Sequence, residues 1–171
     1  MIDKFIGTLR MLDWHIIEKK KAFISLRFLL ERYGELPEEF THYLKSIETG
    51  TSPDKNVWLL CEAEYNGNSD DEFRWNELEL LSLESACGDI SWQNRIKNFW
   101  NNHLPFILSV KGEYSYFAIG VGEANYGQIF YGMEPEFEEV TLIADSLNDF
   151  SSNLEKQALL PEKDYPYNLF F

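Results

Sequence analysis

A series of short apolar segments between residues 103 and 144 constrains the fold more than any other part of the chain. These segments are residues 104–110, 114–121, 126–133 and 140–144. Each is rich in aromatic and β-branched residues and is followed by a turn rich in Gly, Asn, Pro or acidic residues, a pattern typical of β-strands. Parallel strands need long crossover connections, which these short intervals do not provide. The region therefore predicts an antiparallel meander.

A helix is predicted to follow the last strand, and an aromatic tail follows that helix. Leu147, Phe150 and Leu154 recur at intervals of three and four residues, and the Asp-Ser pair at 145–146 can cap the start. Residues 159–171 are aromatic and interrupted by prolines. We expect this tail to be extended and to dock back over the core.

The N-terminal part predicts helices. Apolar residues recur at helical spacing through residues 1–33, which predicts one long helix or two, with Gly34 as the stop. A further helix is predicted to begin near Pro37, because proline suits the first helical turn. Its buried face is predicted to contain Phe40, Tyr43, Leu44 and Ile47.

The middle of the chain leads from these helices into the meander. Residues 57–65 predict a strand whose second half alternates, with Glu62 and Glu64 on one face. Residues 73–83 fit strand alternation and helix propensity equally well, so both assignments stay open. A helix over about residues 91–103 is predicted to lead into the sheet.

These elements together predict one α+β domain. We expect a mainly antiparallel, curled sheet of about five to six strands, with N-terminal helices packed on it and a C-terminal helix after the last strand. The predicted parts are a helical N-terminal part (1–50), a sheet-rich part (55–145) with its single helix, and a C-terminal helix with the aromatic tail (145–171).

Two motifs lie near the two ends of this predicted domain. Residues 36–44 read Leu-Pro-Glu-Glu-Phe-Thr-His-Tyr-Leu. The second motif consists of Ile143, Ala144, Ser146, Leu147, Asp149 and Phe150. The chain thereby resembles the SUKH superfamily, bacterial immunity proteins related to fungal regulators of cell-wall synthesis. That family has an early LP-x-x-(Y/F)-x-x-(F/Y)-L helix and closes with an (I/V)A-x-S-(F/L)-x-(D/E)-F helix. The resemblance implies a protein that binds and neutralises a toxin.

The chain is strongly acidic, with a formal net charge of −14. Such a charge repels nucleic acid and anionic membranes, and it is compatible with a basic protein partner. Residues 113–149 hold eight acids and no Lys or Arg, whereas residues 1–32 hold seven basic residues against four acids. The excess negative charge is therefore predicted to lie on the sheet-rich part.

The sequence contains no segment that predicts secretion or membrane insertion. Its apolar runs are shorter than the ~18 residues of a membrane span, and its first residues lack the pattern of a signal peptide. Cys61 and Cys87 lack the CxxC spacing of a zinc or redox site and are too few for a disulfide framework. We expect two free thiols in a cytoplasmic protein.

Residues with catalytic potential do not form a recognisable constellation. His15, His42 and His103 lie on separate predicted helical segments or their ends, without a GxSxG nucleophile motif. Glu39 and His42 form one Glu-x-x-His pair, whereas a di-metal carboxylate site needs two. Residues 120–122 begin like a dinucleotide fingerprint but lack its third glycine, so they predict a turn. We therefore expect no enzyme, no metal site and no cofactor.

Acidic clusters beside the predicted strands form the candidate partner-binding site. If the sheet curls so that its loops share one rim, their carboxylates can steer a basic partner, and exposed tyrosines beside them can anchor it. The candidates are Glu62, Glu64, Asp70, Asp71, Glu72, Glu113, Tyr114, Glu123, Tyr126, Tyr131, Glu134 and Glu136, with Glu138 and Glu139 in the same turn as the last two.

The expected function follows from this surface and from the resemblance. We expect an immunity protein that occludes the active cleft of a basic toxin of the nuclease or deaminase class. The alternative is a regulatory scaffold that binds a cellular protein, as the fungal relatives do. The identity of the gene immediately upstream distinguishes the two, and the oligomeric state stays open.

Overall fold

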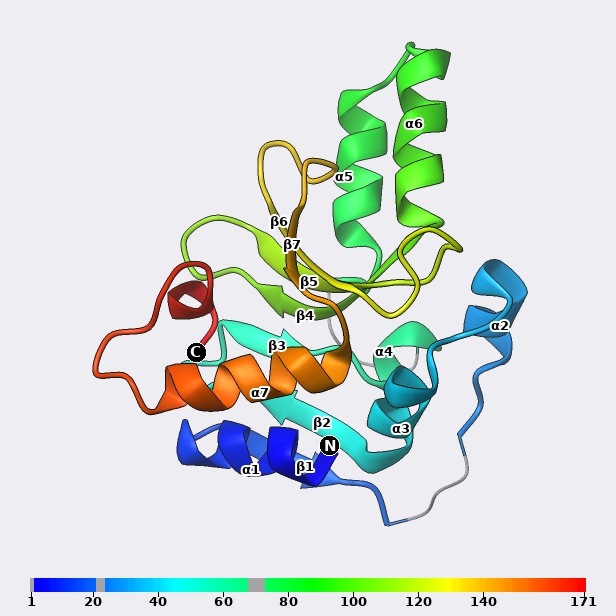
Figure 1. The fold of residues 1–171 in the computed structure, drawn as a ribbon. Helices are drawn as coiled ribbons and strands as arrows, with labels where there is room; N and C mark the ends of the chain where they lie inside the picture. The colour runs from blue at the N-terminus through cyan, green and yellow to red at the C-terminus, as the bar shows by residue number, and fades with distance from the viewer. Residues whose placement is uncertain (1, 21–23, 68–72) are drawn as a thin grey trace.

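A single curled antiparallel sheet forms the centre of the molecule. The computed structural model describes residues 2–20, 24–67 and 73–171 (Figure 1). Within these residues seven strands pair in the same order in space as in sequence. They are β1 (His15–Glu18), β2 (Ile47–Thr51), β3 (Val57–Leu59), β4 (His103–Ser109), β5 (Ser115–Gly120), β6 (Ile129–Met133) and β7 (Thr141–Ala144). The predicted α+β class and antiparallel sheet are confirmed, and the predicted number of strands is too low.

Helices cover the sheet unevenly. They are α1 (Ile2–Met11), α2 (Arg27–Tyr33), α3 (Glu38–Ser46), α4 (Glu62–Tyr65), α5 (Glu77–Ser85), α6 (Ile90–Trp100) and α7 (Leu147–Ala158), followed by a 3-10 turn at Tyr167–Leu169. Helices α1 and α7 pack side by side on the sheet, whereas α5 and α6 form a hairpin that projects away from it (Figure 1). The predicted helix after the last strand is confirmed as α7.

The two strands that the sequence prediction missed lie in the N-terminal part. Of the predicted alternatives for residues 1–33, one long helix is wrong and two helices are found, α1 and α2, but with a strand between them. Helix α1 ends before Asp13, which adopts a left-handed conformation with φ of 60°. The β-branched pair Ile16 and Ile17 then forms β1. The segment after α3 contains β2, where Gly50 allows close packing because a Cβ there would lie 2.5 Å from Cδ1 of Leu59.

The predicted strand over residues 57–65 is also wrong in its second half. Strand β3 ends at Leu59, and α4 begins at Glu62. The Cys61 backbone N–H donates a hydrogen bond of 2.8 Å to Oε2 of Glu64, which stabilises the first turn of a helix. The hydroxyl of Tyr65 donates a hydrogen bond to the Pro105 carbonyl. The Tyr65 ring is therefore buried as part of a helix, and residues 62–65 do not alternate between the two faces of a strand as expected.

The remaining helix predictions differ in quality. In the open region 73–83, the residues from Glu77 onward are helical and belong to α5. The helix predicted over about residues 91–103 is shorter, and it is capped by Asp89, whose carboxylate accepts the Trp92 N–H. Gly34 ends α2 with φ of 74°, as predicted.

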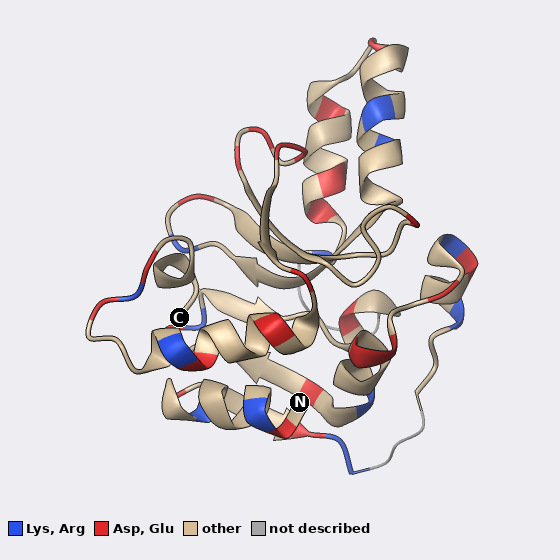
Figure 2. Ribbon diagram, in the orientation of Figure 1, with Lys and Arg blue, Asp and Glu red and all other residues tan. Residues whose placement is uncertain are grey.

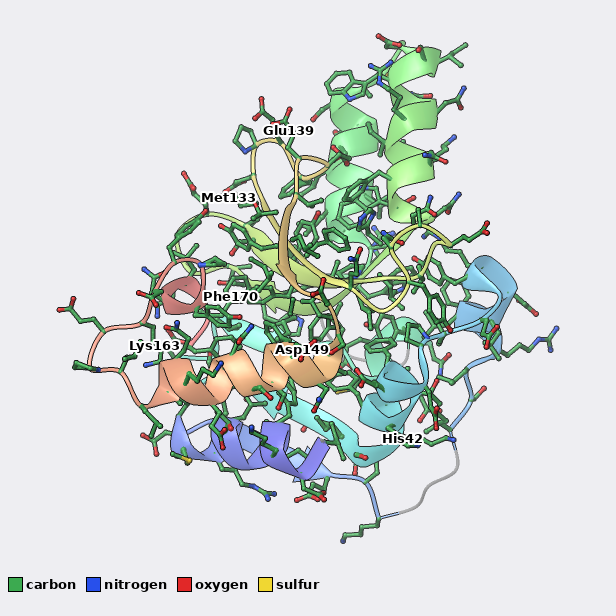
Figure 3. All side chains as sticks on the ribbon, viewed as in Figure 1. His42, Met133, Glu139, Asp149, Lys163 and Phe170 are labelled. Carbon is green, nitrogen blue, oxygen red and sulfur yellow. The ribbon has the colours of Figure 1, made fainter. Side chains whose placement is uncertain are left out.

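An aromatic core connects the sheet, α7 and the tail. Phe117 lies 4.9 Å from Phe150 of α7 and 4.3 Å from Phe170 of the tail, measured between ring centroids. Phe170 is 1% exposed and Phe171 packs against Trp14, so the predicted docking of the tail is confirmed (Figure 3). The tail contains a 3-10 turn and is not wholly extended.

Candidate functional site

The acidic loops lie at two opposite ends of the sheet, so the expectation of one shared rim is wrong. Because neighbouring strands are antiparallel, successive turns alternate between the ends. Ser115 pairs with both Ser109 and Met133, which places the β4–β5 turn and the β6–β7 loop at one end. His103 pairs with Gly120, which places the β5–β6 loop at the other end. The length of β5, at ~3.3 Å per residue, separates them by roughly 20 Å.

The candidate residues are divided between these ends. We call residues 110–114 and 134–140 the acidic end, and we call α4 together with residues 121–128 the opposite end. The acidic end contains Glu113, Tyr114, Glu134 and Glu136, and the opposite end contains Glu62, Glu64, Glu123 and Tyr126. Asp70, Asp71 and Glu72 lie outside the described residues.

Two carboxylates of the opposite end are engaged within the molecule. Glu62 forms an ion pair with Lys19 and accepts a hydrogen bond from the Ser25 backbone N–H. Partial burial opposes ionisation of Glu62, but these hydrogen bonds outweigh it, and the pKa of Glu62 lies below its ordinary value. Glu64 accepts the Cys61 N–H. These side chains hold α4 and the segment before α2 in place.

The β6–β7 loop at the acidic end is held rigidly against the body. The Glu134 carboxylate accepts the Tyr114 backbone N–H at 2.8 Å. The Glu138 carboxylate accepts the indole N–H of Trp100, also at 2.8 Å. Phe137, which lies between Glu134 and Glu138 in sequence, is buried. Its carbonyl accepts a hydrogen bond from the buried Tyr116 hydroxyl. The loop is therefore a fixed platform.

Three carboxylates project from this platform and its neighbouring turn. Glu113, Glu136 and Glu139 are exposed, and within the described residues none of them forms an ion pair. Figure 2 shows the acidic segments of the β6–β7 loop, and Figure 3 places Glu139 near its tip. We call these three residues the acidic rim.

The tyrosines expected to anchor a partner do not line this rim as predicted. Tyr131 is wrongly assigned as exposed: it is 4% exposed and its hydroxyl donates to the Met133 sulfur. Tyr114 is half-buried against Phe73, with ring centroids 5.5 Å apart. Tyr126 is exposed but belongs to the opposite end.

An aromatic side chain that sequence reasoning missed lies beside the acidic rim. Trp92 of α6 is 39% exposed, and Ile90 at the tip of the same helix is 74% exposed. Trp92 lines a hollow of about 260 Å³ together with Leu81 of α5 and residues 135–139 of the loop. No sequence signal separates Trp92 from a core residue, because it continues the apolar stripe of α6. It is exposed because the hairpin projects beyond the sheet (Figure 1).

Among the residues with catalytic potential, His103 is held by hydrogen bonds within the fold. His103 begins β4, and its Nδ1–H donates to the Phe99 carbonyl while Nε2 accepts from the Asn125 amide, both at 3.0 Å. Burial lowers the pKa of His103, which favours the neutral ring. Burial raises the pKa of the Cys61 thiol, and Cys87 is exposed; both thiols are free. His15 lies on β1, contrary to the helix expected for it.

The described residues were compared with the requirements of a metal site and of a membrane-spanning helix. No group of three or more His, Cys, Asp and Glu side chains there could hold a metal ion. No helix among residues 2–20, 24–67 and 73–171 combines the length and apolarity needed to cross a bilayer.

No model of a protein family matches the chain, and no curated protein matches it significantly.

Proposed function

We propose that this chain is a cytoplasmic immunity protein that binds a basic toxin domain and blocks its active cleft. Two observations support the proposal. The motifs at residues 36–44 and 143–150 resemble those of the SUKH superfamily. The acidic rim, which carries the proposal, presents three exposed carboxylates beside an exposed tryptophan, two of them on the fixed β6–β7 loop and one on the neighbouring turn.

The arrangement suits capture of a basic protein. Exposed carboxylates on one side of an interface steer a cationic partner and raise its association rate. A tryptophan beside them can supply a buried anchor, because binding energy concentrates in a few aromatic and arginine contacts. Trp92 and the acidic rim provide the two components on adjoining elements, α6 and the β6–β7 loop.

The proposed mechanism is occlusion without chemistry on the partner. Toxins of the nuclease or deaminase class bind a phosphate backbone, and a cleft that does so is lined with Lys and Arg. The acidic rim would occupy that cleft and exclude the nucleic acid. The projecting α5–α6 hairpin would extend the covered area beyond the sheet.

Co-expression tests this function. The product of the gene immediately upstream, expressed inducibly together with this chain, is the partner to test. We expect the chain to restore growth, and we expect the double variant Glu136→Lys, Glu139→Lys to lose protection. Glu35→Lys with Glu123→Lys makes the same change of charge away from the acidic rim and should still protect. Equal loss in both double variants would show that net charge alone is responsible.

Direct binding measurements sharpen the test. The double variant Glu136→Lys, Glu139→Lys should bind the partner at least about tenfold more weakly than the natural chain at about 50 mM salt. This difference in affinity should be smaller at about 500 mM salt, where the Debye length is roughly threefold shorter. Trp92→Ala should raise the dissociation rate with little effect on the salt dependence. An affinity that does not change with salt would eliminate the electrostatic mechanism.

A further inference from the structure

A second hollow lies on another side of α6, at the opposite end of the sheet. It has a volume of about 900 Å³. One wall is the polar face of α6, and the other is the β5–β6 loop, which lies at the foot of that helix (Figure 1). The aromatic rings of Phe99, His103 and Phe130 also line it. Its composition differs from that of the acidic rim, because Arg95 is its one charged lining residue unless His103 is protonated.

The loop wall is built by a dense hydrogen-bond network. The Asn125 side chain accepts the Gly122 N–H and donates to the Asn102 carbonyl and to His103 Nε2, each at 3.0 Å. Gly122 permits the close approach of the loop to Asn102, because a Cβ on Gly122 would lie 1.9 Å from the Asn102 Oδ1. The hollow is therefore preformed, which lowers the ordering cost of binding.

The helical wall carries amides that have no partner inside the protein. Asn94 and Asn98 are exposed, and within the described residues their side chains make no hydrogen bond. They are four residues apart, which is about 6 Å along a helix axis. Two residues of an extended chain span about 6.6 Å. Since each side-chain amide has both a donor and an acceptor, the pair matches the alternating N–H and C=O groups of an extended backbone.

An apolar surface continues from this hollow to the edge of the sheet. Phe130 of β6 lies directly opposite Leu142 of β7. Such cross-strand neighbours share one face of a sheet. Leu142 is 48% exposed, and β7 is an edge strand that pairs only with β6 among the described strands. An apolar side chain of a bound segment can therefore pack over both residues.

We propose that this hollow binds an extended peptide segment along α6. The amides of Asn94 and Asn98 would hold the segment's backbone, and Phe130 with Leu142 would take an alternate apolar side chain. Arg95, whose guanidinium donates to Ser91 Oγ and forms no ion pair in the described part of the chain, favours a carboxylate on the segment. This site does not depend on the acidic rim and fits a neutral or acidic peptide.

NMR of the full chain tests the site. The probe is a pool of acetylated, amidated hexapeptides in which Leu, Val or Phe alternates with Ser or Thr and one position is Glu. At about 5 mM peptide, a concentration suited to weak binding, we expect shifts of the Asn94 and Asn98 side-chain amide signals and of the Leu142 methyl groups. A pool with the same side chains and N-methylated backbones should produce none of them.

Variants separate binding from folding. Asn94→Ala with Asn98→Ala should weaken binding about tenfold through two lost hydrogen bonds, and the fold should persist because alanine favours a helix. Lys97→Ala, exposed on the same helix but outside the hollow, should bind normally. Three results overturn the proposal: no shifts with the pool, equal shifts with N-methylated peptides, or the same shifts produced by glucose or adenosine in place of peptides.

Discussion

The carboxylates of the acidic rim and two carboxylates near the opposite end of the sheet have different roles. Near the opposite end, Glu62 and Glu79 are hydrogen-bonded to cationic groups and hold helices in place. At the acidic end, the carboxylates of the acidic rim project into solvent. The difference shows that net charge is not one property of this chain: some carboxylates stabilise the fold, and others remain free to act on a partner.

The largest expected effect concerns the ion pair that joins α2 to α5. Arg32 donates two hydrogen bonds to Glu79, at 2.9 and 2.8 Å, and its guanidinium lies 5.6 Å from the centroid of the Trp75 ring. Glu79→Gln leaves this largely buried cation without its counter-charge. We expect the free energy of unfolding to fall by about 3 kcal/mol, measured by urea denaturation at pH 7.

The same helix provides a matched control for this prediction. Arg27 and Glu31 also form an ion pair, but their side chains are 87% and 61% exposed. Solvent screens such a pair, so Glu31→Gln should change stability by less than about 0.5 kcal/mol. Equal losses of stability in Glu79→Gln and Glu31→Gln would mean that burial does not determine how much each ion pair contributes.

The second-largest effect on stability is expected at Gly122, where the backbone of the opposite end packs closely. Gly122→Ala places a methyl group against Asn102 and disturbs the hydrogen bonds of Asn125. We expect a loss of about 2 kcal/mol, as for other overpacked sites, measured by thermal or urea unfolding.

Gly7→Ala is the appropriate comparison. Gly7 lies within α1, and a Cβ there would meet no heavy atom within 4 Å. Alanine should therefore stabilise this helix by about 0.5–1 kcal/mol. If Gly122→Ala were equally harmless, the close contact with Asn102 would not be needed for folding.

The parts of this structure that follow from sequence are those governed by local rules. The meander over β4–β7 follows from strand patterns and turn residues, and Ser146 caps α7 as predicted, accepting the Asp149 N–H. Strand β1 could not be predicted, because its four residues are stabilised by pairing with β2, a contact distant in sequence. Residues 62–65 predict a strand because acidic and apolar residues do alternate there in the sequence. The cap formed by Cys61 and Glu64 and the burial of Tyr65 nevertheless favour a helix.

The candidate site was harder to predict than the fold. The individual acidic residues are evident in the sequence, but which of them share an end depends on the direction of each strand. The partners that engage Glu62 and Glu138 are also remote in sequence: Lys19 and Trp100. Exposure of Trp92 depends on how far α5 and α6 project beyond the sheet, and no local sequence pattern predicts this distance.

A smaller effect is expected from the pH dependence of stability. The folded pKa of His103 lies below its unfolded value of about 6.5, because burial disfavours the charged ring. As pH falls below 6.5, the unfolded state binds the proton more tightly, so the free energy of unfolding should decrease. The stability contribution is fully present above that pH.

Comparison with a variant isolates this histidine. His103→Gln retains hydrogen-bonding capacity and leaves the other two histidines of the chain unchanged. Urea unfolding at pH 7.5, 6.5 and 5.5 should show a weaker pH dependence for the variant than for the natural chain. Identical slopes would show that His103 does not contribute, and an NMR titration of its ring should then give an ordinary pKa.

The smallest effect on stability is expected at the acidic rim. Neutralising Glu113, Glu136 and Glu139 to Gln removes no ion pair known from the described residues and relieves repulsion in an acidic protein. We expect the free energy of unfolding to stay within about 0.5 kcal/mol of the natural value, or to rise slightly. The single change Glu62→Gln should instead cost about 1.5 kcal/mol, because it weakens charge-assisted hydrogen bonds.

This pair of measurements tests the comparison between the ends most directly. The triple variant should be as stable as the natural chain and should lose capture of a basic partner, whereas Glu62→Gln should lose stability and keep capture once folded. If the triple variant unfolds as easily as Glu62→Gln, the rim carboxylates hold the fold together and are not free to serve an interface. If it is stable and still protects cells, recognition depends on Trp92 and the hairpin without electrostatic help.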